Sequence, residues 1–238
     1  MRRLYVPEEQ IAPQVALTAE QLHYLRDVLR LLDGEPLEVF DGRGTAYRAV
    51  LQGESLRIGD KLLQEPRALD VVLAQALARG EKMDLVVQKA TELGASRIVP
   101  LISERAVVRL DAQRGPARTQ RWRRIAQEAA RQCGRADVPA VDEPCSWEML
   151  LALLRGEPER RALLLEAQEP ALRLGDAARG VSRILLAVGP EGGFSPRERE
   201  SALQGGFVPV GLGSRVLRTE TAGLAALAVV LHVHGELG

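Results

Sequence analysis

From residue 70 onward, this chain alternates short apolar runs with amphipathic helical segments, and that alternation restricts its fold more than any other feature. The apolar runs read as buried strands, and they cover residues 71–76, 98–102, 138–141, 162–165, 184–188 and 207–210. Repeated strand–helix alternation is typical of a parallel sheet that is covered by helices on both faces. We therefore expect an α/β fold for residues 70–238.

The segments between these runs carry signals for helix boundaries. Three predicted helices end just before a glycine, the residue that most readily follows a last helical turn; they cover residues 82–93, 116–132 and 146–154. For a fourth helix, Ser195 is a suitable N-cap, Pro196 suits the first helical position, and Glu198 closes a capping box.

Residues 1–69 differ from the rest, because short strand-like runs recur there between glycine-containing turns. The pattern predicts a small β-barrel with strands at residues 4–6, 37–40, 45–51, 55–58 and 61–63. One helix is expected to interrupt it over residues 18–31, with Thr18 and Gln21 as a capping box. Its apolar stripe would comprise Leu22, Leu25, Val28, Leu29 and Leu32. We expect two domains, residues 1–69 and 70–238.

Composition argues against several classes of protein. The sequence has no apolar run of membrane-spanning length and no signal peptide, and Cys133 and Cys145 form no CxxC pair, so a reduced cytoplasmic protein is expected. His232 and His234 lack a neighbouring cluster of Cys or His, so no metal site is expected. Scarce lysine and absent asparagine fit either a thermophilic source or a GC-rich genome.

Charge is balanced over the whole chain, with 32 basic and 32 acidic residues, but it is unevenly distributed. Residues 105–135 hold nine arginines against Asp111 and Glu128. Such a segment is typical either of a face that contacts phosphates or of a solvated helix, and charge alone does not separate the two.

Two glycine-rich loops follow strand-like runs near the C-terminus, at residues 189–194 and 212–222. Loops that leave the carboxyl ends of parallel strands form the ligand crevice of an open sheet, and glycine lets a ligand approach the backbone closely. A small-molecule pocket is one interpretation, and a turn that needs glycine for its geometry is the other. The second loop leads into a helix at 222–233 that is apolar nearly all round, hence buried, with Thr219 or Thr221 as its cap.

Together with further segments, the two loops resemble the ribosomal RNA small subunit methyltransferase E family. Loop 189–194 reads Gly-Pro-Glu-Gly-Gly-Phe, and loop 212–222 reads Leu-Gly-Ser-Arg-Val-Leu-Arg-Thr-Glu-Thr-Ala. The other matching segments lie, in order along nearly the whole chain, at residues 28–30, 40–42, 79–83, 88–94, 103–105 and 132–135. The departure is Arg131, where an acid such as Glu is expected.

The resemblance implies a SPOUT-class domain whose parallel sheet ends in a trefoil knot at about residues 185–225. It implies that residues 1–69 form a PUA-like β-barrel that helps to hold RNA. It further implies a cytoplasmic homodimer that binds S-adenosylmethionine in the knot and methylates N3 of one uridine in 16S ribosomal RNA of the small ribosomal subunit.

Three sets of candidate residues follow from the loops and the resemblance. The cofactor set is Leu165, Glu166, Gly189, Pro190, Glu191, Gly192, Gly193, Leu212, Gly213, Val216, Leu217 and Thr221. The catalytic set is Arg218, which would stabilise the uracil anion or anchor a phosphate, and Glu220, which would act as a base or pair with Arg218. The RNA-binding set is Arg26, Arg30, Lys89, Arg105, Arg131, Arg135 and Arg215.

Other functions remain open at this point. A SPOUT-class ribose 2′-O-methyltransferase acting on ribosomal or transfer RNA would share the fold and the cofactor. A non-catalytic RNA-binding protein would keep the fold without binding the cofactor. A nucleotide-phosphate site is disfavoured because the chain has no GxxxxGK[ST] loop.

Overall fold

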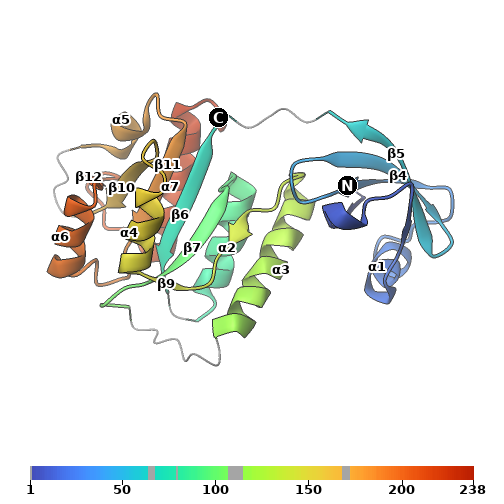
Figure 1. Ribbon diagram of the computed structural model, residues 1–238, viewed down its shortest axis with the longest axis horizontal. Helices are drawn as coiled ribbons and strands as arrows, with labels where there is room; N and C mark the ends of the chain where they lie inside the picture. The colour runs from blue at the N-terminus through green and yellow to red at the C-terminus, as the bar shows by residue number, and fades with distance from the viewer. Residues whose placement is uncertain (1, 64–67, 79, 107–114, 168–171) are drawn as a thin grey trace. The chain divides into compact units, whose positions relative to one another are not determined.

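The computed structural model describes residues 2–63, 68–78, 80–106, 115–167 and 172–238 (Figure 1). The chain forms two compact units: Met1–Pro66 with Gln127–Val138, and Arg67–Ala126 with Pro139–Gly238. The predicted division after residue 69 stays a proposal, and it did not anticipate that residues 127–138 pack with the N-terminal unit.

The larger unit is built around a parallel sheet in the order β12-β10-β11-β6-β7-β8, with β9 also pairing with β7. The strands are β6 (Asp70–Ala76), β7 (Arg97–Ile102), β8 (Ala140–Val141), β9 (Cys145–Ser146), β10 (Arg161–Leu165), β11 (Arg183–Val188) and β12 (Val208–Val210). The helices are α2 (Lys82–Leu93), α3 (Gly115–Cys133, shared with the smaller unit), α4 (Trp147–Arg155), α5 (Leu174–Ala178), α6 (Pro196–Gln204) and α7 (Thr219–Val233).

Helices cover both faces of this sheet (Figure 1). On one face Leu150 of α4 and Ala202 of α6 share a buried apolar cluster with Val72 and Leu185 of the sheet. On the other face α2 and α5 pack against α7, and α7 packs against β6 and β11. The predicted α/β class is therefore confirmed.

The chain returns across the sheet between β12 and α7. β12 lies at an edge of the sheet beside β10, whereas α7 packs against β6 and β11 in the middle. A trefoil knot over about residues 185–225 needs a return path of this kind, and the knot itself stays a prediction.

Helix boundaries that depend on local signals are confirmed. Gly94 follows α2 in the left-handed conformation, with φ 105°. Ser195 and Glu198 form the predicted capping box of α6, with proline in its first turn. Among the described residues, no helix is long and apolar enough to cross a membrane.

The predicted start of the last helix was wrong. Helix α7 begins at Thr219 rather than at 222, its N-cap residue is Arg218, and the Arg218 side chain makes no capping bond. Thr219 and Thr221 lie inside the helix, and the Thr219 hydroxyl donates to the Gly189 carbonyl oxygen rather than capping α7. The short elements α5 and β9 were not predicted from the sequence.

The smaller unit contains a five-stranded sheet in the order β1-β3-β4-β5-β2, parallel between β1 and β3 and antiparallel elsewhere. Its edges in the described part of the chain are β1 and β2, so the predicted PUA-like barrel is present as a curled half-barrel. Its elements are β1 (Arg3–Tyr5), the 3₁₀ helix η1 (Glu8–Gln10), β2 (Gln14–Ala16), α1 (Ala19–His23), the π-helix η2 (Tyr24–Val28), β3 (Pro36–Phe40), β4 (Ala46–Gln52) and β5 (Ser55–Leu62).

Two expectations for the smaller unit were wrong. The predicted turn at Gly59–Asp60 does not exist, because β5 runs through it and the register with β4 shifts instead. The helix expected over 18–31 keeps its capping box but widens into η2. The expected stripe survives only in part: Leu25 is buried and Leu29 packs against the same core, whereas Val28 is exposed where the helix widens and Leu32 is exposed beyond its end.

Candidate functional site

The loops that follow β10, β11 and β12 enclose a cavity of about 660 Å³, including the space at its open mouth. All three strands are parallel, so their carboxyl ends meet at the same edge of the sheet, where open α/β sheets bind ligands. The lining residues are Leu165, Glu166, Ala167, Val188, Gly189, Pro190, Glu191, Gly193, Leu212, Gly213, Arg215, Val216, Leu217, Thr219 and Ala222.

Most of the residues predicted to bind a cofactor therefore line one cavity. The exceptions are Gly192, which lies beside it, and Thr221, which is exposed on α7. Arg215, predicted to contact RNA, lines the cavity. The sequence reasoning did not assign Val188 and Ala222 to the cavity, although Val188 directly precedes the first predicted loop and Ala222 is the last residue of the second.

Glycine is required at Gly193 and Gly213 for backbone conformation rather than for space. Their φ angles are +68° and +117°, and an added Cβ would meet no atom within 4 Å at either position. Gly192 differs, because an added Cβ would lie 3.7 Å from the Arg105 side chain, an ordinary contact.

We expect Gly213→Val to weaken binding of a ligand in this cavity by roughly tenfold or more. A β-branched residue at positive φ costs about 1–3 kcal/mol of strain, and about 1.4 kcal/mol corresponds to tenfold in affinity. Titration calorimetry checks this. Gly53→Val is the matched control: Gly53 has φ +60° in the hairpin between β4 and β5, so it should lower the melting temperature without changing affinity. Equal affinity of Gly213→Val and the wild type would contradict the prediction.

A buried polar contact ties α7 to the first loop. The Thr219 hydroxyl donates to the Gly189 carbonyl oxygen at 2.6 Å and accepts from Nε2 of Gln75 at 2.8 Å. Gln75 is fully buried near the carboxyl end of β6, and a side chain at Gly223 of α7 would collide with its amide. Gln75 and Gly223 thus fix how closely α7 approaches the sheet.

Glu198 holds the first loop against the turn that follows β7. Its buried carboxylate accepts from the Ser195 amide at 2.8 Å, the Ser103 hydroxyl at 3.1 Å and the Glu104 amide at 2.9 Å. Two of these bonds come from the turn after β7, and Arg105 adds a third link, because its guanidinium donates to the Gly192 carbonyl oxygen at 3.0 Å. Arg105, predicted to contact RNA, therefore touches the loop beside the cavity.

Lys82 joins two carboxylates at the start of α2. Its ammonium lies 3.1 Å from Oε1 of Glu191, which lines the cavity, and 3.2 Å from Oε2 of Glu220 in the first turn of α7. The hydrogen bonds to Glu191 and Glu220 raise the pKa of Lys82. Glu220 thus pairs with Lys82 and not with Arg218, whose exposed guanidinium forms no ion pair with the described residues. The sequence reasoning assigned no role to Lys82.

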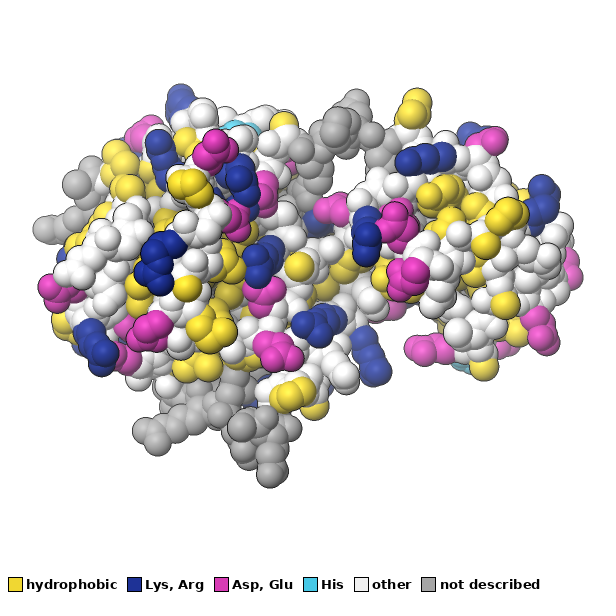
Figure 2. All heavy atoms as spheres, viewed as in Figure 1, with side chains coloured by type: hydrophobic (Ala, Val, Ile, Leu, Met, Phe, Trp, Pro, Cys, Tyr) yellow, Lys and Arg dark blue, Asp and Glu magenta, His cyan; other side chains and the backbone are white. Residues whose placement is uncertain are grey.

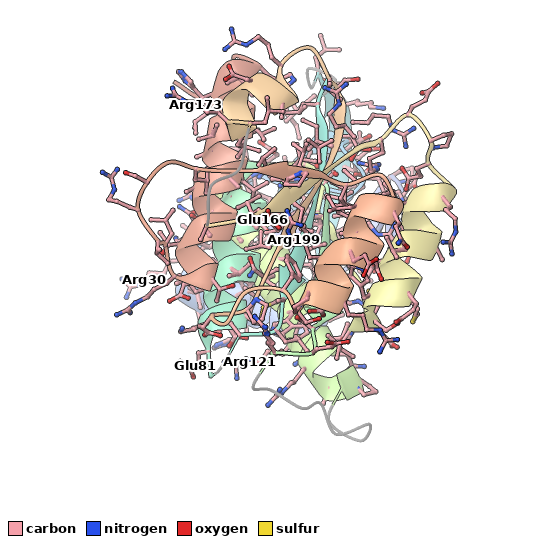
Figure 3. The ribbon with its side chains drawn as sticks, turned by 90° about the vertical axis from the view of Figure 1, so that its left-hand side faces the viewer. Arg30, Glu81, Arg121, Glu166, Arg173 and Arg199 are labelled. Atoms are coloured by element: carbon pink, nitrogen blue, oxygen red, sulfur yellow. The ribbon has the colours of Figure 1, made fainter. Side chains whose placement is uncertain are left out.

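A second ion pair orients Glu166 at the cavity wall. Arg199 of α6 meets it through two contacts, Nε to Oε1 at 2.5 Å and Nη2 to Oε2 at 3.3 Å. The two residues are labelled side by side in Figure 3; Glu166 directly follows β10, and Arg199 lies on α6. The hydrogen bond from Arg199 to Glu166 raises the pKa of Arg199.

The other predicted RNA-binding residues are dispersed, and most are paired. Arg26 pairs with Asp33, Lys89 with Glu92, Arg131 with Glu128 and Arg135 with Asp137, and the Arg131 guanidinium stacks on Tyr24. Arg30 is exposed at a positive φ of 54° (Figure 3). The partners Asp33 and Glu128 are exposed, so these two pairs contribute little free energy and do not exclude a phosphate contact, whereas the Arg135 side chain is largely buried.

The basic segment 105–135 is only partly described, since Arg109 and Arg114 lie outside the described residues. The exposed arginines of α3 are Arg118, Arg121, Arg123 and Arg124. Figure 2 shows basic and acidic side chains interspersed over α3 and α4 on the face in view. In the described ranges, no group of His, Cys, Asp and Glu could hold a metal ion.

Comparison with known proteins gives consistent matches over both units. Residues 65–231 match the RNA methyltransferase domain, and residues 17–62 match the RNA methyltransferase PUA domain. Ribosomal RNA small subunit methyltransferase E from Bacillus subtilis is 32% identical over 92% of this chain and 90% of its own length. The Synechocystis protein of that name is 36% identical over 96% of this chain and 76% of its own length.

A solved structure extends the likeness to three dimensions. Ribosomal RNA small subunit methyltransferase E from Neisseria gonorrhoeae, bound to S-adenosyl methionine, has 34% sequence identity and a TM-score of 0.87. The alignment covers 98% of this chain and 97% of that one.

Proposed function

This chain belongs to the ribosomal RNA small subunit methyltransferase E family, and from that premise we propose that it transfers a methyl group from S-adenosylmethionine to N3 of a uridine in 16S ribosomal RNA. The observation that carries the proposal is the cavity at the carboxyl ends of β10, β11 and β12, where most of the predicted cofactor residues meet. We further propose that it acts in the cytoplasm, as a homodimer, on the small ribosomal subunit.

The residues of the cavity fit this cofactor. The absence of atoms near an added Cβ at Gly193 and Gly213 leaves open space in which a flat ring system can approach the backbone. Val188, Leu217 and Ala222 add apolar surface, as in most small-molecule sites. Glu166 and Glu191, held by Arg199 and Lys82, would offer carboxylate oxygens to the hydroxyl groups of such a molecule.

The chain's own task is to position the uracil and to handle its proton. When bound, S-adenosylmethionine supplies an electrophilic methyl group, so orientation and charge stabilisation account for most of the catalysis. N3 carries a proton that it must lose, and Glu220 is the base that we propose. Arg218 lies beside the amino end of α7, where its guanidinium would stabilise the uracil anion.

RNA binding would draw on both units. The exposed arginines of α3, together with Arg30 and Arg215, would contact phosphates around the target. N3 lies on the pairing edge of uracil, so the base must be unpaired or turned out of its stack to react.

The direct test is transfer of labelled methyl groups from S-adenosylmethionine to small ribosomal subunits that lack the modification, followed by nucleoside analysis. We expect the label in 3-methyluridine. Label in a ribose-methylated nucleoside would keep the cofactor and overturn the substrate position. If no label is transferred and calorimetry detects no cofactor binding, the alternative of a non-catalytic RNA-binding protein would be favoured.

A further inference from the structure

We infer that Lys82 is a positioning residue for methyl transfer, holding the Glu191 loop of the cofactor cavity and Glu220 of α7 in fixed relation to each other. This inference rests on the proposed function and deepens it. The contacts of Lys82 connect three parts of the fold that are far apart in the sequence: the start of α2, the loop after β11, and the first turn of α7.

The geometry places one cation between two carboxylates. The Lys82 ammonium lies 3.1 Å from Glu191 and 3.2 Å from Glu220. Oε2 of Glu220 is shielded from solvent, and only 12% of the Glu220 side chain is exposed. A shielded carboxylate oxygen is costly unless a cation or donor faces it, and Lys82 supplies that cation.

Lysine suits this position better than arginine. Its ammonium is a compact point charge with three donors, which two carboxylates from different directions can share. Without the cation, each carboxylate would lose a positively charged partner, and a carboxylate that loses such a partner takes up a proton more readily. Lys82 therefore bridges the two carboxylates and fixes the orientation of Glu220, the proposed base.

Apart from Arg218, the charged groups named below on the surrounding elements have partners of their own. On α2, Asp84 pairs with Arg121, and Lys89 pairs with Glu92. On β6 and β11, Asp70 and Arg183 take part in a network with Arg160 and Glu157, and on α5 Asp176 pairs with Arg179. Arg218 adjoins Glu220 in sequence without an ion pair to the described residues.

The arrangement would link cofactor binding to the chemical step. Glu191 lies on the wall of the cavity, so a bound cofactor would contact the loop that carries it. Lys82 contacts both Glu191 and Glu220 through charge-assisted hydrogen bonds, so the position of the Glu191 loop would influence that of Glu220. The base would then be correctly aimed only when the cofactor loop is in place.

The test compares Lys82→Met and Lys82→Arg with the wild type. Measured at saturating cofactor, kcat for methyl transfer is expected to fall about tenfold or more in Lys82→Met, and the acid limb of its pH profile should move to higher pH, since loss of an adjacent cation favours protonation of a carboxylate. Lys82→Arg should restore the position of the acid limb. Arg179→Met, which removes a cation paired with Asp176 on the surface, is the control and should leave both quantities unchanged.

A second variant is expected to shift the acid limb of the pH profile in the opposite direction. Glu191→Gln removes a negative charge next to the same ammonium, so the acid limb should move to lower pH even if Lys82→Met folds poorly. Wild-type kcat and acid limb in Lys82→Met, or no shift in Glu191→Gln, would overturn the inference while the proposed function stands. Failure of the wild type to transfer methyl groups would overturn the proposed function and this inference with it.

Discussion

Arg218→Met is expected to slow methyl transfer by about 10²- to 10³-fold, the usual cost of removing one group that stabilises developing negative charge. The guanidinium is exposed beside the mouth of the cavity and forms no ion pair with the described residues, so it is free to face a substrate. Cofactor affinity should hardly change, because Arg218 does not line the cavity. Single-turnover rates and calorimetry measure the two effects separately.

A control separates this loss from a general loss of positive charge. Arg173→Met removes an exposed arginine next to α5 that does not line the cavity, and its rate should stay within a few-fold of the wild type. A full rate in Arg218→Met would remove Arg218 from the mechanism. A loss of cofactor affinity as large as the loss of rate would instead assign it to binding.

Local signals explain why much of the fold could be predicted from the sequence. The capping box of Ser195 and Glu198 and the glycine after α2 depend on residues within a few positions of each other. The parallel sheet follows from apolar runs that alternate with such helices. The passage of β5 through Gly59 follows from its pairing with β4 across a shift in register, which the turn-like residues Gly59 and Asp60 do not reveal, and the local pattern gave no sign that η2 widens.

In the candidate site, too, local features could be predicted from the sequence and contacts between distant residues could not. Its loops were predicted because glycines directly follow apolar runs, and parallel strands bring their carboxyl ends together. The contacts that support these loops were not predicted, because their partners are far apart in the sequence. Lys82 and Glu191 are separated by 109 positions, and Gln75 and Thr219 by 144. Only the three-dimensional structure shows that Lys82 and Gln75 make these contacts.

Arg160→Met is expected to lower the free energy of unfolding by about 2–4 kcal/mol. Breaking a buried ion pair costs about 3–5 kcal/mol, and the partial exposure of its partners reduces that figure. Only 4% of the Arg160 side chain is exposed; it lies 2.6 Å from Asp70 and 2.7 Å from Glu157 and also donates to the Ile184 carbonyl oxygen. The variant leaves two neighbouring carboxylates with Arg183 as their remaining shared cation.

The pH dependence of unfolding identifies the cause of this loss. Burial alone would raise the pKa of Asp70, but hydrogen bonds from Arg160 and Ser96 outweigh it, so the pKa is lowered. A lowered pKa gives stability that is present above the unfolded value, about 3.9, and is lost as pH falls through the folded value. Denaturant unfolding at pH 7 and near pH 3 should therefore show a larger gap between wild type and Arg160→Met at pH 7. Arg155→Met, which changes an exposed residue of α4, is the control and should have the same free energy of unfolding as the wild type at both pH values. A gap that does not depend on pH would mean that lost packing, rather than the ion pair, accounts for the effect.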